Sequence, residues 1–319
     1  MLARILGTGS CLPEFRLTND DLAHLVETSD EWIRERTGIR ERRLTAVGTT
    51  AMAAEAAGKA LADAGVAAGE LDMILAATAT PDYLFPGTAC QVQAELGAAQ
   101  AVCYDLSAAC SGFLFALHAA SAYIAAGMAR TILVIGAETM SKITDWSDRG
   151  TCILFGDGAG AAVVRADETG ILSADLGSDG SRGMVLPCRG RPLNSPAFRE
   201  EGQGETIVMD GQEVFRFAVR TVPGTIRRAL ARADLAPEDI RYFLLHQANE
   251  RILTSAAKKL GVPMERVPVN IGHCGNTAAA SLPILLDEMN RAGKLARGDK
   301  IVLAGFGGGL TWGAVVLEW

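Results

Sequence analysis

Short apolar runs and helical patterns alternate along the whole chain. Apolar runs predict buried strands, and apolar positions at three- and four-residue spacing predict helices. Strands are predicted at residues 5–8, 71–77, 101–104, 131–136, 242–246 and 300–304, and helices at residues 50–64 and 88–96. This alternation predicts an α/β protein with largely parallel, covered sheets, in which ligands bind beyond the carboxyl ends of the strands.

The second half of the chain repeats the pattern of the first at a constant spacing. Residues 60–75 and 229–244 both predict helix, turn and strand, and they lie 169 positions apart. Gly136 and Gly305, each after an apolar strand, have the same spacing. A spacing shared by two distant segments indicates duplication. We therefore expect two similar halves with a site between them, the first spanning residues 1–168 and the second 169–319.

Cys110 stands at the joint between a predicted strand and a predicted helix. Its nearest neighbours are serine, alanine and glycine, so another molecule can approach the sulfur. A cysteine at a helix N-terminus feels the positive end of the helix dipole, which lowers the pKa of the thiol and favours a nucleophile. The alternative is a small buried apolar residue, which is the role of most free cysteines. Both interpretations stay open on this segment alone.

A histidine and an asparagine of the second half are the candidate partners of Cys110. His246 ends an apolar strand, where an active-site base is often presented; the alternative is a buried histidine with satisfied hydrogen bonds. Asn276 lies in a loop before a helix, and the 169-residue spacing pairs it with Ser107. The two helix starts should then lie side by side, with Asn276 next to Cys110. His118, more than two turns along the helix from Cys110, is expected in the core.

Glycines of the second half and arginines of the first indicate where a ligand would bind. Residues 305–309 lack the lysine and the following helix of a phosphate loop, so their backbone amides better suit an oxyanion. The spacing of Thr28 and Glu31 predicts a capping box and the start of a helix. Several arginines follow, and with Trp32 they form either an anion site with an aromatic platform or a solvated basic face.

The composition excludes several classes of protein. The chain has 319 residues, a formal net charge of −7 and 49% hydrophobic residues, which are values of a globular protein and not of a general nucleic-acid binder. Seven cysteines without a CxxC pair predict reduced thiols in the cytoplasm. The adjacent His273 and Cys274 are poorly spaced for one tetrahedral ion, so no metal is expected. No apolar run reaches the roughly 18 residues that span a membrane, and residues 1–7 do not resemble a signal peptide.

Seven motifs, taken together, resemble those of one enzyme family. They are TSDEWIR at residues 28–34, ACSGF at 109–113, RGT at 149–151, FGDGAG at 155–160, HQAN at 246–249, GNT at 275–277 and GFGGG at 305–309. With them, the chain resembles the β-ketoacyl-acyl carrier protein synthase III family of the thiolase superfamily over nearly its whole length. The Cys/His/Asn set also separates it from condensing enzymes with two histidines.

The resemblance implies a fold, an assembly and a reaction. The fold is a duplicated, layered αβαβα thiolase-like architecture, and the assembly is a homodimer. Cys110 would take an acyl group from acyl-CoA, and malonyl-acyl carrier protein would lose carbon dioxide and condense with the Cys110 thioester. His246 and Asn276 would stabilise the malonyl enolate, and the amides of Cys110 and Gly305 would form the oxyanion hole. Acyl-CoA is then a substrate, and no resident cofactor or metal is implied.

The resemblance also assigns residues to coenzyme A. Trp32 and Arg149 would sandwich the adenine ring. Thr28 and Arg36 would lie nearby, and Asn249 would lie along the pantetheine arm.

A third group of residues would meet other protein surfaces. Phe85 would reach into the acyl pocket of the partner subunit. Arg251, Lys258 and Lys259 share one helical face, and Arg216 matches a further position of the family. Acyl carrier proteins are acidic, so an acidic enzyme needs a local basic patch to recruit one; the alternative is a solvated charged face. Residues 186–204 match the family least closely, so the length and branching of the primer are not predicted.

Three other functions use the same residue types. A close relative could acylate oxygen, nitrogen or another acceptor in a specialised pathway. A Cys-His-Asn thioester hydrolase has these residues in the same chain order, although the duplication weighs against it. A non-catalytic acyl-binding subunit would not need an intact Cys/His/Asn set. Only the condensing enzyme makes a carbon–carbon bond from acyl-CoA and malonyl-acyl carrier protein.

Overall fold

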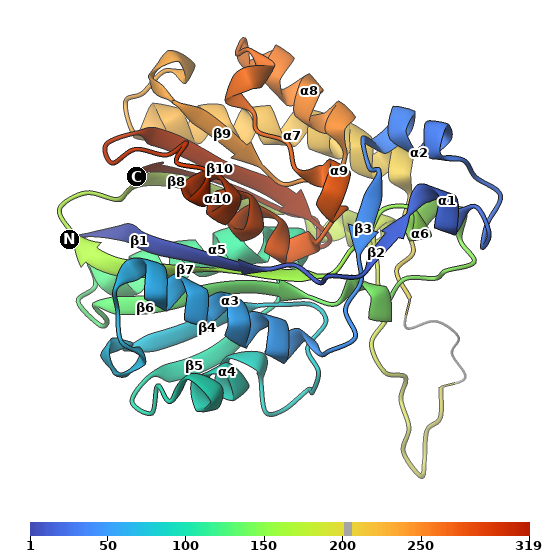
Figure 1. Ribbon diagram of the computed structural model, residues 1–319, viewed down its shortest axis with the longest axis horizontal. Helices are drawn as coiled ribbons and strands as arrows, with labels where there is room; N and C mark the ends of the chain where they lie inside the picture. Colours follow the sequence, from blue (N-terminus) through green and yellow to red (C-terminus); the bar gives the residue numbers. More distant parts are fainter. Residues whose placement is uncertain (201–205) are drawn as a thin grey trace.

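Two β-sheets organise the chain, in a computed structural model that describes residues 1–200 and 206–319 (Figure 1). The first sheet has the strand order β1 (Leu2–Cys11), β7 (Gly158–Asp167), β6 (Thr131–Glu138), β4 (Met73–Ala77) and β5 (Val102–Leu106). The second has the order β8 (Ile171–Ser178), β11 (Thr311–Glu318), β10 (Lys300–Gly307) and β9 (Tyr242–Leu245). The predicted strands are therefore present.

The two sheets repeat one another strand by strand. β1, β4 and β6 each begin 169 residues before β8, β9 and β10. Because the order β1-β7-β6-β4 matches the order β8-β11-β10-β9, the predicted duplication is confirmed. Within the described residues, β5 has no counterpart in the second sheet. The chain passes between the sheets between Asp167 and Ile171; that the two halves are separate domains stays a prediction.

The prediction of largely parallel sheets is wrong. β4 pairs in parallel with β5 and β6, and β9 with β10, but the other four pairings of these sheets are antiparallel. β11 follows β10 after residues 308–310, a connection too short for the crossover that parallel strands need. A buried apolar run carries no mark of strand direction, so periodicity alone could not distinguish the two arrangements.

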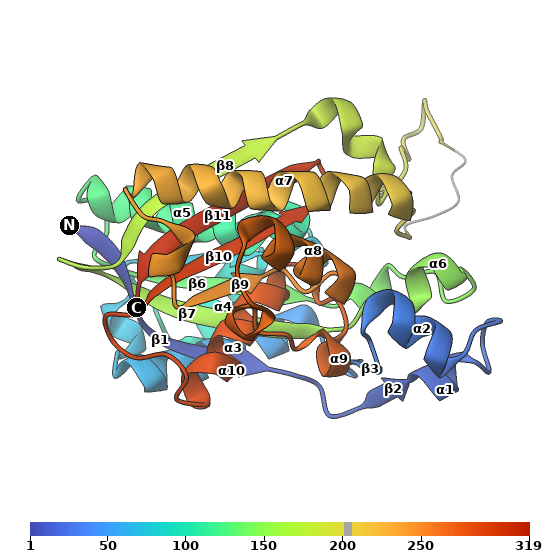
Figure 2. The ribbon, with the colours of Figure 1, turned by 90° about the horizontal axis from the view of Figure 1, so that it is seen from above.

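Helices form three layers around the two sheets, which gives the expected αβαβα architecture (Figures 1 and 2). The outer layer on the first sheet is α3 (Thr49–Ala64) and α4 (Thr88–Leu96), the middle layer is α5 (Gly112–Ala125) and α10 (Ser281–Arg291), and the outer layer on the second sheet is α7 (Gly211–Arg232) and α8 (Glu250–Leu260). Each sheet is thus covered on both faces. Among the described residues, no helix combines the length and apolar character needed to cross a membrane.

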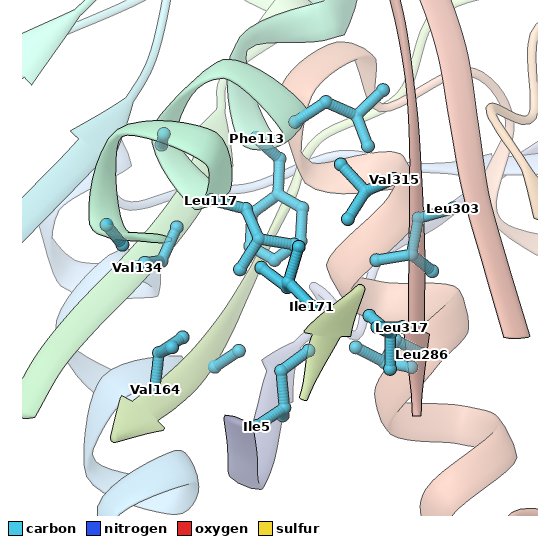
Figure 3. Packing of buried hydrophobic residues seen from close by; sticks show 14 of the residues in the cluster. Ile5, Phe113, Leu117, Val134, Val164, Ile171, Leu286, Leu303, Val315 and Leu317 are labelled. Carbon is cyan, nitrogen blue, oxygen red and sulfur yellow. The ribbon is translucent and has the colours of Figure 1, made fainter. Parts of the chain in front are cut away.

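The central core lies between the two sheets. Phe113 and Leu117 of α5 pack with Leu286 of α10, and Val134 and Leu303 reach them from the facing sheets (Figure 3). All five side chains are buried, and each buried side chain of this kind stabilises the fold by about 1.5–3 kcal/mol. This apolar layer holds the starts of α5 and α10 in one place. His118 lies on the exposed side of α5, so its predicted place in the core is wrong.

Small elements gather at one end of the sheets (Figures 1 and 2). They are β2 (Arg16–Thr18), α1 (Asn19–Leu22), α2 (Asp30–Thr37), β3 (Glu41–Arg43), α6 (Arg149–Cys152) and α9 (Ile271–Cys274). The N-cap of α2 is Ser29, whose Oγ accepts the Trp32 amide at 3.2 Å, so the capping box predicted from Thr28 is wrong by one residue. The burial predicted for the strand after Ala101 is also wrong, because β5 is an edge strand with Val102 61% exposed.

Candidate active site

Two short turns with unusual backbone lie where the starts of α5 and α10 meet. The turn η2 (Ala109–Ser111) carries Cys110, and η7 (Ala278–Ala280) precedes α10. Ala109 and Ala278, 169 positions apart, have positive φ angles of 46° and 44°. An alanine in this region costs about 1–2 kcal/mol and persists only where its surroundings hold it there. The two turns are in contact, so the predicted meeting of the helix starts is confirmed.

Cys110 carries a thiol that the protein environment keeps protonated. Burial, together with the negative charge of Glu138, raises the pKa of this thiol to about 12. The prediction of a lowered pKa is therefore wrong, because the cost of desolvating a thiolate exceeds the help from the N-terminus of α5. Cys110 is therefore a thiol at neutral pH.

His246 follows β9 and is held by the strand beside it. Its amide donates to the carbonyl of Ala304 at 2.8 Å, and its ring packs edge-on against Phe306 with the ring centroids 5.6 Å apart. The residue is 2% exposed, and burial lowers the pKa of the imidazole to about 4, so the ring is neutral at pH 7. Nδ1 is buried without a hydrogen-bond partner among the described residues. A buried N–H group without an acceptor costs more free energy than a buried ring nitrogen without a donor. The neutral ring therefore carries its proton on Nε2 and not on Nδ1.

Asn276 is fixed by three hydrogen bonds that leave its amide nitrogen available. Its backbone amide donates to Leu154 at 2.8 Å, and its carbonyl accepts the Gly156 amide at 3.0 Å. Its side-chain Oδ1 accepts the amide of Ala278 at 3.0 Å. No described acceptor takes the Nδ2 protons, so this amide presents a donor in a set orientation.

One cavity brings the three predicted residues together. It has a volume of about 460 Å³, within the range of small-molecule sites. Cys110, His246 and Asn276 line it, and Phe306 and Gly307 lie beside them. The cavity continues toward the small elements along residues that include Arg36, Gly150, Phe215, Asn249 and Arg251. The cavity therefore leads from the small elements to the Cys110 sulfur.

The glycine segment approaches Cys110 at a different residue from the predicted one. A methyl group on Gly307 would lie 2.6 Å from the amide nitrogen of Cys110, and one on Gly305 would instead meet the His246 side chain at 3.0 Å. Gly307 is therefore the glycine whose backbone passes next to Cys110. The sequence pointed to the segment, but the choice among its glycines depends on how β10 lies against η2.

Trp32 lies under two of the predicted arginines at the outer end of the site. The guanidinium carbon of Arg36 is 4.3 Å from the Trp32 ring centroid, and that of Arg149 is 4.8 Å from it. Asn249 caps α8 by accepting the Arg251 amide, and its Nδ2 donates to the Arg36 carbonyl at 2.9 Å. The hydroxyl of Thr28 is buried without a described partner. The structure thus gathers these predicted residues around an aromatic platform with two cations.

Comparisons with known proteins decide the family. The model described as 3-oxoacyl-[acyl-carrier-protein] synthase III matches residues 104–180, and the model of its C-terminal part matches residues 230–319. A β-ketoacyl-[acyl-carrier-protein] synthase III of Clostridium acetobutylicum is 49% identical over 318 residues, which cover 99% of this chain and 98% of the relative. The chain belongs to the β-ketoacyl-acyl carrier protein synthase III family. The predicted family, fold and enzyme class are confirmed.

Solved structures agree with this family and extend its range. The crystal structure of 3-oxoacyl-[acyl-carrier-protein] synthase III from Aquifex aeolicus has a TM-score of 0.93 at 46% identity, covering 99% of this chain and all of that one. A priming β-ketosynthase from the R1128 polyketide biosynthetic pathway has a TM-score of 0.93 at 36% identity, with 99% and 96% coverage. Proteins described as a 3-oxoacyl-[acyl-carrier-protein] synthase III and as a priming β-ketosynthase of a polyketide pathway therefore share this backbone.

The surface positions predicted for this family member are exposed, and two of them, Arg216 and Arg251, also line the cavity that contains Cys110. Phe85 is 84% exposed, next to exposed Tyr83 and Leu84. The predicted basic face is exposed on α7 and α8, with Arg216 paired to Glu213, Arg251 over the ring of Phe215, and Lys259 donating to Val219. The loop at residues 186–204 begins at the cavity with Leu186, and its residues 201–204 lie outside the described residues.

Sequence reasoning missed Glu138, which lies fully buried at the end of β6 and next to the active site. The available signal was a charged residue that ends an otherwise apolar strand. It also missed that His273, Cys274 and Glu288 have ligand atoms within 4.8 Å of one another, the one such group in residues 1–200 and 206–319. His273 Nε2 already pairs with Glu288 at 2.9 Å, which accounts for the contact without an ion.

Proposed function

We propose that this chain starts fatty-acid synthesis by condensing an acyl-CoA primer with malonyl-acyl carrier protein, and that Cys110, His246 and Asn276 carry the reaction. The observation that supports this most is the convergence of these three side chains on one 460 Å³ cavity in a member of this family. The products are 3-oxoacyl-acyl carrier protein, coenzyme A and carbon dioxide. We infer no resident cofactor, and acyl-CoA acts as a substrate.

The first step transfers the acyl group from sulfur to sulfur. The Cys110 sulfur attacks the thioester carbonyl, the bond to the CoA sulfur breaks, and the Cys110 proton ends on the CoA thiol. The raised pKa of Cys110 means that its proton leaves during the attack and not before it. In our proposal the amides of Cys110 and Gly307, in place of Gly305, bind the oxygen that gains negative charge, because Gly307 is the glycine that passes next to Cys110.

The second step makes the carbon–carbon bond. Malonyl-acyl carrier protein loses carbon dioxide, and the electron pair that remains forms an enolate. His246 Nε2–H and Asn276 Nδ2–H both donate to the thioester oxygen of this enolate, a charge that exists only in and near the transition state. A neutral imidazole is the right form for this donation, which agrees with the lowered pKa of His246. The enolate carbon then attacks the Cys110 thioester, the bond to the Cys110 sulfur breaks, and the leaving thiolate takes up a proton from water to restore the thiol.

The carriers would approach from the end of the sheets where the small elements gather. Trp32 would stack on adenine with Arg149 on its other face, and Arg149 would have to move from its present 4.8 Å by about one ring thickness, ~3.5 Å. Thr28, Arg36 and Asn249 would line the same path. The acidic carrier protein would dock on Arg216, Arg251, Lys258 and Lys259, where steering by opposite charge suits its negative surface.

We further propose that the enzyme is a cytoplasmic homodimer. The exposed side chains of Tyr83, Leu84 and Phe85 support an assembly, because a cluster of three large apolar side chains needs a cover. In the dimer, Phe85 would enter the acyl pocket of the partner subunit. The edge strand β5 is close in sequence to this segment and has no neighbour on its outer side among the described strands.

A second candidate is priming in a specialised pathway, with a different acceptor or primer. The 36%-identical priming β-ketosynthase favours it, because its backbone and this one superpose with a TM-score of 0.93. The two functions differ in primer and acceptor, and the loop at residues 186–204, which begins at the cavity with Leu186, lies between the segments that the two family models match.

The test is a product assay with acyl-CoA and malonyl-acyl carrier protein. Formation of 3-oxoacyl-acyl carrier protein by the wild type, and its loss in Cys110→Ala, is the expected result. Free acid without condensation would point to a hydrolase. No product from malonyl-carrier, but transfer to another acceptor, would support the specialised pathway.

A further inference from the structure

Glu138 is a buried carboxylate that the proposed mechanism does not use. It is 0% exposed, and its Oε2 accepts the Thr80 hydroxyl at 2.5 Å and the Ala79 amide at 3.1 Å. The amide of Ala279 in η7 also interacts with the carboxylate, and η7 packs directly on β6, where a methyl group on Gly136 would lie 2.3 Å from the Ala279 oxygen. All of these donors are neutral, and no described cation pairs with it. A buried carboxylate without a cation is costly, and burial raises its pKa to about 7. Because Glu138 is buried at this cost and lies beside the active site, we examine whether it has a role in the reaction.

The contact with Ala279 connects Glu138 to Asn276. Ala279 is the middle residue of η7, and the preceding amide, that of Ala278, donates to Asn276 Oδ1 at 3.0 Å. Two side chains therefore hold consecutive amides of one turn whose backbone is strained at Ala278. If Glu138 released Ala279, the turn could relax, and the amide of Asn276 would lose the geometry that aims its Nδ2 into the cavity.

The internal repeat shows how the two halves differ at this point. Glu138 and Gly307 are 169 positions apart, as are Cys110 and Ala279. In one half, the Glu138 carboxylate interacts with the amide of Ala279. In the other half, Gly307 has no side chain, so no carboxylate stands next to the amide of Cys110. The Glu138 carboxylate thus lies next to a backbone amide of η7, in the position that the acyl oxygen would take next to the backbone amide of Cys110.

We propose that Glu138 is a positioning residue for the condensation step, acting through η7 on Asn276. This inference rests on the proposed function. Glu138 binds the turn that carries Asn276 and makes no described hydrogen bond to the amides of Cys110 or Gly307. Glu138 also acts on Cys110 through its negative charge, which raises the pKa of the thiol, so its removal should slow condensation but not acyl transfer.

The test is the variant Glu138→Gln, which keeps the shape of the side chain but turns an NH₂ group toward amide donors. Condensation with malonyl-acyl carrier protein should fall about 10- to 100-fold, the loss expected when a catalytic group shifts by up to about 1 Å. Acylation of Cys110 by acyl-CoA, followed by intact mass, should not slow, because loss of the negative charge at residue 138 makes the Cys110 proton easier to remove. Asp175→Asn is the matched control, because Asp175 is also buried, at 4% exposed, but binds Thr225 and Arg228 away from the cavity. Asp175→Asn should affect acylation and condensation to the same extent.

A double variant separates positioning from general damage. In an Asn276→Ala background, Glu138→Gln should have no further effect on condensation, because the group that it positions is gone. Equal losses of both steps in the single variant, or additive losses in the double variant, would overturn the proposal. If Glu138→Gln does not fold, Thr80→Val can replace it, because it removes the hydroxyl that donates to Glu138 at 2.5 Å. Thr80→Val should slow condensation more than acylation, by a smaller factor than Glu138→Gln. Equal losses of both steps in Thr80→Val would also overturn the proposal. A wild type that is acylated but never condenses would instead refute the proposed function.

Discussion

Replacement of Gly307 by alanine should block acylation of Cys110 while leaving the protein folded. The new methyl group would lie 2.6 Å from the Cys110 amide nitrogen and 3.1 Å from its Cβ, about 0.9 Å inside ordinary contact with that nitrogen. The φ angle of Gly307 lies outside the left-handed region, so the cost is steric and not conformational. The methyl group would cover the amide that we assign to the oxyanion hole. Loss of one such donor lowers a rate by about 100- to 1,000-fold.

The assay is the rate at which the intact protein gains one acyl mass from acyl-CoA. Overpacking of this size costs about 1–3 kcal/mol of stability, so thermal unfolding has to be measured beside it. Gly58→Ala is the matched control, because nothing lies within 4 Å of its new methyl group and alanine favours a helix. Gly305→Ala should acylate faster than Gly307→Ala. If Gly307→Ala is acylated at the wild-type rate and Gly305→Ala is acylated more slowly, the amide of Gly305 and not that of Gly307 belongs to the oxyanion hole.

Three further predictions address the carriers and the histidine. Trp32→Ala should raise the KM for acyl-CoA about tenfold, because one stacking contact with a base is lost, and should leave the KM for malonyl-acyl carrier protein unchanged. An equal rise in both KM values would mean that Trp32 does not bind coenzyme A. Lys258→Glu should raise the KM for malonyl-acyl carrier protein but not for acyl-CoA, and unchanged kinetics at low salt would mean that α8 does not dock the carrier. Since burial lowers the pKa of His246 to about 4 from 6.5, the unfolded chain binds the proton first as pH falls, and the free energy of unfolding should drop by about 2 kcal/mol between pH 6.5 and 5. Urea denaturation should show a shallower drop in His246→Leu than in His118→Leu, and equal slopes would mean that His246 is not buried as a neutral ring.

The architecture could be predicted from the sequence because a duplication leaves a constant spacing between matching segments of the two halves. The 169-residue spacing pairs Asn276 with Ser107 and predicts that the two helix starts meet, and the structure places the turns before these helices in contact. The same spacing then relates two strained alanines, Ala109 and Ala278. Backbone strain itself has no sequence signature when the residue is alanine, so this part of the site could not be predicted.

The electrostatics of the site could not be predicted either. Local sequence placed Cys110 at a helix start and implied a lowered pKa, but the pKa depends on burial and on Glu138, which is distant in the chain. For the same reason the sequence could not choose among the glycines of GFGGG: the motif identifies the segment, whereas the packing of β10 on η2 brings Gly307 next to Cys110, which is why we propose it in place of Gly305. Motifs define which residues take part, and tertiary packing sets their charge and their distances.

The most direct test of the central claim is to follow one acyl group through Cys110. The protein is incubated with single acyl-CoA primers, from acetyl to decanoyl and branched, freed of excess donor, and weighed before and after addition of malonyl-acyl carrier protein. We predict one added acyl mass that maps to the Cys110 peptide, and its disappearance as 3-oxoacyl-acyl carrier protein forms. An acyl mass on another residue, or one on Cys110 that leaves only as free acid, would contradict the account.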